Sequence, residues 1–298
     1  MTETLELAAA GRLGLALGGG LGLVVVLERN HLRELRRREI FKRWRTWAVA
    51  GPLFALAALG PEWLAVAFVA ALSFQALREF AAMTELSQPY RGCLYAAGIA
   101  SAPIAATSLT LWRAMPPVLL VLATLPPLVR QDVRDGVRNL AYAGLGFAYV
   151  PWLLGYFLLL REHVDGGRGL LLALGSAIAM SDVGAYVVGS TLGRHKLAPA
   201  LSPGKTWEGV AGNVGGAYLG FATMAFALPQ SMPGALRWSL PLVVAAGAVW
   251  GDLVESLLKR QFGVKDAGAW LPGFGGLLDR IDSLLVVLPL VYTVVVLL

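Results

Sequence analysis

The sequence predicts an all-α integral membrane protein, a polytopic bundle of about ten transmembrane helices. Of its 298 residues, 57% are hydrophobic and only 15% are charged, and the mean hydropathy is +0.64. These values do not fit a soluble domain. Long runs of Leu, Val and Ala approach the roughly 20 helical residues that a bilayer core requires. Such runs favour helices over a barrel, because a backbone in lipid must satisfy its own hydrogen bonds.

Ten apolar runs are candidate spans. In chain order they cover residues 8–27, 46–60, 62–77, 94–112, 115–129, 139–160, 169–190, 209–228, 239–258 and 284–298. The first is preceded by Glu3 and Glu6 instead of basic residues, and no small-residue cleavage site follows it. We therefore expect a retained helix, not a signal peptide. The single cysteine, Cys93, excludes an internal disulfide and a cysteine-rich metal site.

Positive charge lies mostly in the loops on one side of these spans. Residues 28–45 hold eight Lys and Arg against three Glu, which places this segment in the cytoplasm by the positive-inside rule. Counting forward through ten spans, the five segments on that side carry 20 of the 25 Lys and Arg. The net charge of +6 therefore records topology and contact with lipid headgroups, and nucleic acid is not an expected partner.

The first polar segment that membrane insertion does not explain runs from 181 to 209. Asp182 lies within an apolar run, where an ionisable group is functional by default; a structural hydrogen bond to a neighbouring helix is the alternative. The run Gly204-Lys205-Thr206 is not a P-loop, because Pro199 stands where that motif needs glycine. It is a glycine-rich, Lys-bearing loop that opens a helix near Trp207, a setting that attracts phosphate.

The second polar segment, 251–283, carries more charge. Asp252, Glu255, Ser256 and Lys259 fall at i, i+3, i+4 and i+7 and form one stripe on a helix. Asp279 and Asp282 are likewise one helical turn apart, and a bound cation would relieve their repulsion. Oxygen ligands without His or Cys nearby favour Mg²⁺ over zinc.

The lysines are concentrated in the same two polar segments. The chain has 20 Arg and only five Lys, and four of these lysines lie here: Lys196, Lys205, Lys259 and Lys265. A compact ammonium on a flexible stem suits phosphate binding, although chance in so few residues would also account for the bias.

The motifs in these two polar segments resemble those of a known family. Ser256-x-x-Lys259-Arg260-x4-Lys265-Asp266, followed by Gly-Gly and Asp279-Arg280-Ile281-Asp282, resembles the signature of the phosphatidate cytidylyltransferases, also called CDP-diacylglycerol synthases. The earlier Ser-Asp-x-Gly-Ala-Tyr and Ser-Pro-Gly-Lys-Thr-Trp-Glu-Gly resemble that family's other recurring segment. The likeness covers about residues 175–290. It implies a membrane nucleotidyltransferase that condenses CTP with phosphatidate to give CDP-diacylglycerol and pyrophosphate with Mg²⁺.

The resemblance also implies roles for individual residues. By position, the metal-binding carboxylates are Asp252, Asp279 and Asp282, with a potassium ion proposed beside the magnesium. Nucleotide or phosphate handling is assigned to Asp182, Lys205, Thr206, Glu208, Ser256, Lys259, Arg260, Lys265, Asp266 and Arg280. Of all these, the predicted catalytic residues are Asp252, Asp279, Lys259, Arg280 and Lys205. We therefore divide the chain into N-terminal transmembrane helices in 1–135, including the basic segment, and a C-terminal catalytic region in 136–298.

One position departs from the family pattern. Phe274 stands where the signature has histidine before Gly-Gly, which leaves an inactive or altered-substrate relative as one alternative. A CTP-dependent lipid-alcohol kinase and a transporter-like membrane protein are the others; a CDP-alcohol phosphotransferase is disfavoured because its Asp-Gly-x2-Ala-Arg segment is missing. The expected partners are CTP, phosphatidate or a related anionic phospholipid, and the bilayer, and a homodimer stays open. The expected location is the bacterial inner membrane, with the site facing the cytoplasm.

Overall fold

The computed structural model describes residues 8–9, 11–12, 14, 18, 39–268, 270 and 275–298. Most of the predicted first span, residues 28–38 of the basic segment, and Phe274 lie outside the described residues. The named helices are α2 (Glu39–Leu59), α3 (Glu62–Met83), α4 (Gln88–Thr107), α5 (Leu109–Leu122), α6 (Leu125–Arg130), α7 (Gly136–Phe147), η2 (Ala148–Trp152), α8 (Leu153–His163), α9 (Gly167–Leu192), α10 (Trp207–Thr223), η3 (Ala225–Ala227), α11 (Gly234–Gln261) and α12 (Leu278–Leu297).

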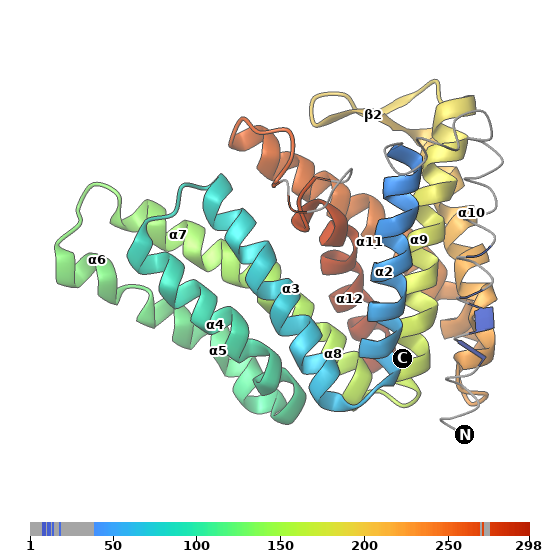
Figure 1. The fold of residues 1–298 in the computed structure, drawn as a ribbon, viewed down its shortest axis with the longest axis horizontal. Helices are drawn as coiled ribbons and strands as arrows, with labels where there is room; N and C mark the ends of the chain where they lie inside the picture. The colour runs from blue at the N-terminus through green and yellow to red at the C-terminus, as the bar shows by residue number, and fades with distance from the viewer. Residues whose placement is uncertain are drawn as a thin grey trace.

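The helices form one bundle with two sides (Figure 1). Helices α3 to α8 make up one side, and α9 to α12 with α2 make up the other. The unit α7-η2-α8 lies at the centre, since 67% of the most apolar part of Gly136–His163 is buried. Only 6% of the corresponding part of Leu109–Arg130 is buried, so α5 and α6 lie at the periphery.

The central unit is not a regular α-helix along its whole length. Its middle, η2, is a π-helical turn that contains Pro151. Proline has no N–H to donate to the preceding turn, and single π turns accommodate such an interruption without ending the helix. The next turns bury Leu154, Phe157 and Leu158 in the core.

Glycine brings α9 and α10 into close contact. Gly212, Gly216 and Gly220 recur every fourth residue on α10 and face the α9 backbone, so an added Cβ would overlap the carbonyl oxygens of Gly184, Met180 and Ser176. Small residues at this spacing allow membrane helices to approach backbone to backbone. The contact fixes the two helices that flank the first polar segment.

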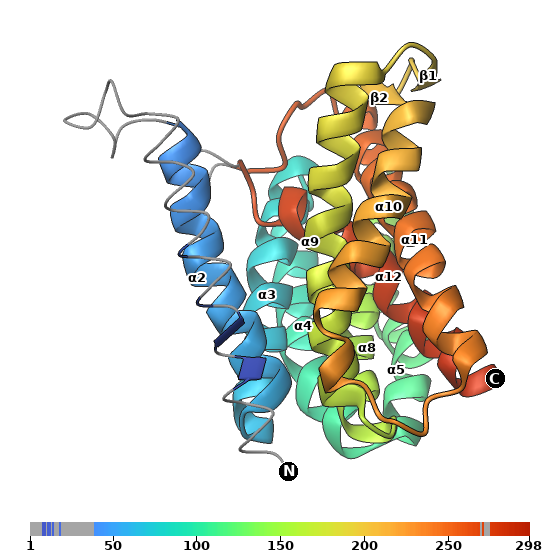
Figure 2. The same cartoon turned by 90° about the vertical axis from the view of Figure 1, so that its right-hand side faces the viewer.

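A short antiparallel hairpin joins these two helices at one end of the bundle (Figure 2). Strand β1 (Lys196–Ala198) pairs with β2 (Ser202–Thr206), and α10 begins directly at Trp207. The predicted helix start near Trp207 is confirmed, whereas the sequence predicted only a loop before it. Figure 1 shows the hairpin at the same end as the C-terminal turn of α11.

The all-α membrane class is confirmed, and the number of spans is not. Within the described residues, six helices are long and apolar enough to cross a bilayer: Glu62–Met83, Leu109–Arg130, Gly136–His163, Gly167–Leu192, Gly234–Gln261 and Leu278–Leu297. Helix α10, with 17 residues, is not among these six, and residues Ala48–Leu59 of α2 form a shorter apolar helix. A total of about ten spans therefore stays a prediction.

Candidate active site

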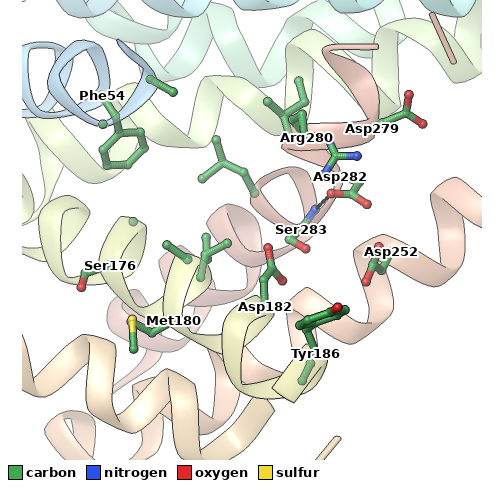
Figure 3. A pocket seen from close by; sticks show the side chains of 18 of the residues that line it. Phe54, Ser176, Met180, Asp182, Tyr186, Asp252, Asp279, Arg280, Asp282 and Ser283 are labelled. Carbon is green, nitrogen blue, oxygen red and sulfur yellow. Dashed lines mark hydrogen bonds between the residues drawn. The ribbon is translucent and has the colours of Figure 1, made fainter. Parts of the chain in front are cut away.

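A cavity of about 1190 Å³ lies between α2, α3, α9, α10, α11 and α12. Part of its wall is apolar, with Phe54, Phe68, Leu72 and Leu172. Apart from Arg45 of α2, the charged lining residues come from the two motif segments: Asp182, Lys205, Asp252, Asp279, Arg280 and Asp282. Figure 3 shows these acidic side chains gathered on one side of the cavity, with Phe54 on the other. The cavity thus combines an apolar portion with a charged portion.

The first turns of α12 present the two carboxylates of the second motif. Asp279 and Asp282 are 8% and 6% exposed, and they lie one turn apart as the sequence predicted. The Asp279 carboxylate accepts hydrogen bonds from the amides of Gly276 (2.8 Å) and Ala267 (3.0 Å). It also accepts from Lys259 Nζ at 2.8 Å. Asp279 is therefore a fully bonded carboxylate within the protein.

Lys259 links α11 to this turn. Its ammonium lies 2.5 Å from Glu255 Oε2, one turn earlier on α11, as well as 2.8 Å from Asp279 Oδ1. Glu255 and Asp279 are almost completely buried, so water does not solvate their carboxylates. The positive charge of Lys259 stabilises both of them instead. The confirmed helical stripe on α11 thus fixes the start of α12.

Asp282 and Asp252 form the second carboxylate pair. Their carboxyl groups are close enough to interact electrostatically, and Asp282 Oδ1 also accepts from the amide of Ser283 at 2.7 Å. The helices approach this closely because Gly251 packs against the backbone of Asp282, where any Cβ would overlap the carbonyl oxygen. Asp252 in turn forms an ion pair with Lys205.

Asp182 approaches the same place from α9. Figure 3 shows its side chain pointing across the cavity toward Asp282 and Ser283. Its charged neighbours are Asp252, Lys205 and Arg280. The charge that the sequence singled out inside an apolar run therefore faces the cavity.

The hairpin carries Lys205 into the site and is itself held by polar contacts. Thr206 Oγ1 accepts from the Gly209 amide at 3.1 Å and caps α10. Glu208 accepts from the His195 ring at 2.6 Å and from the Arg194 and His195 amides. These hydrogen bonds, the ring first, lower the pKa of Glu208 to about 2.

Several predicted site residues lie away from the cavity lining within the described part of the chain. They are Glu208, Ser256, Lys259, Arg260, Lys265 and Asp266. Arg260 Nε donates to the Leu201 carbonyl at 3.3 Å and ties α11 to the hairpin. Lys265 and Asp266 are exposed on the segment after α11. For all six residues, the role in nucleotide handling stays a prediction.

Sequence reasoning missed two polar residues near the site. Glu79 of α3 is buried and binds the amides at the start of α12. Asn213 of α10 is 2% exposed, lines the cavity, and its Oδ1 has no hydrogen-bond partner. A charged or amide group within an apolar helix is the signal that marks both positions.

The fold and the site define a helical integral membrane protein whose charged residues converge on one side of an apolar cavity. Residues 41–298 match the sequence model of the Cytidylyltransferase family. The chain therefore belongs to the cytidylyltransferase family and is a nucleotidyltransferase.

Individual relatives agree with this assignment. The chain is 32% identical over 271 residues to Uncharacterized protein YnbB of Escherichia coli (strain K12), covering 88% of this chain and 89% of the relative. It is 41% identical over 162 residues to Phosphatidate cytidylyltransferase of Mycobacterium leprae (strain TN), covering 53% and 49%. A Staphylococcus epidermidis protein of the same name is 38% identical, covering 53% and 57%. The match thus spans about half of the length of the relatives with that name.

Proposed function

We propose that this chain transfers the cytidylyl group of CTP to phosphatidate, giving CDP-diacylglycerol and pyrophosphate for phospholipid biosynthesis. The observation that carries the proposal is the cavity, whose apolar wall continues into a cluster with Lys205 and Arg280. An amphipathic phospholipid needs the apolar wall, and a triphosphate needs the cations. Family membership and the names of the mycobacterial and staphylococcal relatives support the same reaction.

The chemistry is a displacement at phosphorus. A phosphatidate oxygen attacks the α-phosphorus of CTP, one P–O bond forms, and the bond to the bridging oxygen of the β-phosphate breaks. Pyrophosphate leaves with that electron pair. The attacking phosphate is already anionic near neutral pH, so no protein base is required. Lys205 and Arg280 stabilise charge on the triphosphate, and the cavity aligns nucleophile and leaving group.

The carboxylates at the charged side fit a magnesium ion. The carboxyl groups of Asp252 and Asp282 are electrostatic neighbours at the cavity, and a cation would relieve repulsion between them when both are ionised. Among the described residues no group of three or more His, Cys, Asp or Glu side chains is arranged to hold a metal ion. Mg²⁺ is usually held by one or two carboxylates together with substrate phosphates and water, so two carboxylates are enough for this proposal. When bound, it would neutralise charge on the nucleotide.

Asp279 is the third carboxylate that the motif resemblance assigned to the metal. Its oxygens are already engaged by Lys259 and two backbone amides. We therefore propose Asp252 and Asp282 as the ligands and assign Asp279 to orienting Lys259 and the first turn of α12. We also propose that the site faces the cytoplasm of a bacterial inner membrane, where CTP is available. The Lys and Arg bias between the loops supports this orientation.

The test is a label-transfer assay on purified protein in phosphatidate-containing vesicles. CTP labelled at the α-phosphate should yield labelled CDP-diacylglycerol, identified by chromatography, in the presence of Mg²⁺. Label from the γ-phosphate entering lipid would instead indicate a lipid kinase. Lysophosphatidate and an isoprenoid phosphate serve as alternative acceptors in parallel reactions. Failure of α-label to enter phosphatidate, with an active mycobacterial relative alongside, would refute the proposal.

A further inference from the structure

The buried carboxylate of Glu79 binds the start of α12. Glu79 lies on α3, is 6% exposed, and accepts from the amide of Leu277 at 2.9 Å through Oε1 and from the amide of Leu278 at 2.8 Å through Oε2. Gln75, one turn earlier on α3, donates to Oε1 at 3.0 Å. Both carboxylate oxygens are therefore engaged, across a separation of 198 residues.

These contacts use the special chemistry of a helix start. The first amides of a helix have no partner within it, and the helix dipole favours a negative charge there. Glu79 supplies that charge from within the protein, so the start of α12 is not free to bind a substrate phosphate. Gly276 makes room for this arrangement, because a Cβ there would lie 2.6 Å from Glu79 Oε2.

The turn held by Glu79 is the one that carries the proposed chemistry. Asp279 follows Leu278 directly, and Arg280 and Asp282 lie within the next turn of the same helix. All three line the cavity. A shift of this turn would therefore move the carboxylates and a phosphate-binding cation together.

We propose that Glu79 is a positioning residue for the nucleotidyl transfer. Helix α3, which belongs to the predicted N-terminal region, holds the first turn of α12 in register so that Asp282 faces Asp252. The catalytic consequence rests on the proposed function, whereas the clamp on α12 does not. An N-terminal helix thereby supports the charged side of the site through Glu79, which does not itself line the cavity.

The test compares Glu79→Gln with Glu62→Gln, which neutralises an exposed carboxylate at the other end of α3. Glutamine presents an NH₂ group to one of the two amides and loses that hydrogen bond. Hydrogen exchange of residues 275–285 should accelerate in Glu79→Gln, with α10 unchanged. The Mg²⁺ concentration that gives half-maximal transfer should rise about 10- to 100-fold, as when supporting partners of metal ligands are removed. Glu62→Gln should match the wild type in both measurements.

A milder variant covers the case in which Glu79→Gln does not fold. Gln75→Ala removes one donor to Glu79 and should shift exchange and Mg²⁺ dependence in the same direction by a smaller factor. Unchanged exchange in 275–285 and unchanged Mg²⁺ dependence in the folded variant would overturn the inference. Equal loss of activity at every Mg²⁺ concentration without faster exchange would also overturn it. If the wild type transfers no label while exchange still accelerates in Glu79→Gln, the clamp stands and the proposed reaction fails.

Discussion

Lys205 on strand β2 forms an ion pair with Asp252 on α11, 47 residues further along the chain. The pair joins the two polar segments at the cavity and leaves both side chains partly accessible, at 21% and 43% exposure. A partly exposed pair exchanges partners more readily than a buried one, because water compensates each charge. Lys205 is therefore in a position to release Asp252 and bind a triphosphate.

Lys205→Met should abolish most of the transfer activity. The variant removes the ammonium that faces the cavity while keeping a side chain of similar length. We expect the rate to fall about 100-fold or more, the range seen when one charge-stabilising group is deleted. The α-label assay measures this loss. Lys196→Met is the matched control: it changes an exposed lysine on β1 that does not line the cavity, and its activity should equal that of the wild type. Equal rates for the two variants would contradict the role of Lys205.

Asp252→Asn should weaken the binding of Mg²⁺ without disrupting the hairpin. The amide oxygen of asparagine still accepts from Lys205, but the ligand charge for a hard cation is lost. The Mg²⁺ concentration for half-maximal transfer should rise about tenfold or more. Asp135→Asn, at an exposed carboxylate beside Arg138, is the control and should leave it unchanged. A normal Mg²⁺ titration for Asp252→Asn would exclude Asp252 as a ligand.

Much of the site follows from local rules that the sequence displays. The spacing of Asp279 and Asp282 places both in adjacent turns of one helix, and the stripe from Asp252 to Lys259 lies on one helix as well. The phosphate-attracting helix start after Thr206 is equally local, since the cap needs only the residue three positions later. Periodicity and capping rules act over one or two turns, which is why these features could be predicted.

The remaining features depend on contacts between distant segments. Glu79 bonds to Leu277 only because α3 packs beside α12, and no spacing rule connects two residues 198 positions apart. Likewise, Asp279 binds Lys259 whereas Asp282 lies beside Asp252. This difference depends on how α11 packs against α12. The strand that carries Lys205 is too short, and too rich in proline and glycine, to be distinguished from a loop by pattern.

The hairpin should open in acid because of Glu208. Its folded pKa of about 2 lies below the ordinary value of 4.5, because the His195 ring and two amides bind the charged form. Its contribution to stability is therefore fully present above the ordinary pKa and is lost as the pH falls from about 4.5 to about 2.

Pepsin cleavage within residues 194–206, followed by mass spectrometry in this pH range, measures the opening. The wild type should be protected near the upper limit, about pH 4.5, and cleaved near the lower limit, about pH 2. Glu208→Gln, which has no carboxylate to protonate, should be cleaved more than the wild type at the upper limit and to the same extent as the wild type at the lower limit. A parallel pH response in the two proteins would show that another group controls the hairpin.

Substituting Gly216 by alanine should destabilise the packing of α9 on α10. An added Cβ would overlap the Met180 carbonyl oxygen and press against the Ser181 backbone, next to Asp182. Forcing a methyl group into such a contact costs about 1–3 kcal/mol. Gly215, the preceding residue on the same helix, has no atom within 4 Å of an added Cβ. Gly215→Ala should therefore be neutral or stabilise the helix by about 0.5–1 kcal/mol. Thermal unfolding in detergent compares the two variants, and a lower Tm for Gly215→Ala than for Gly216→Ala would contradict the backbone contact between α9 and α10.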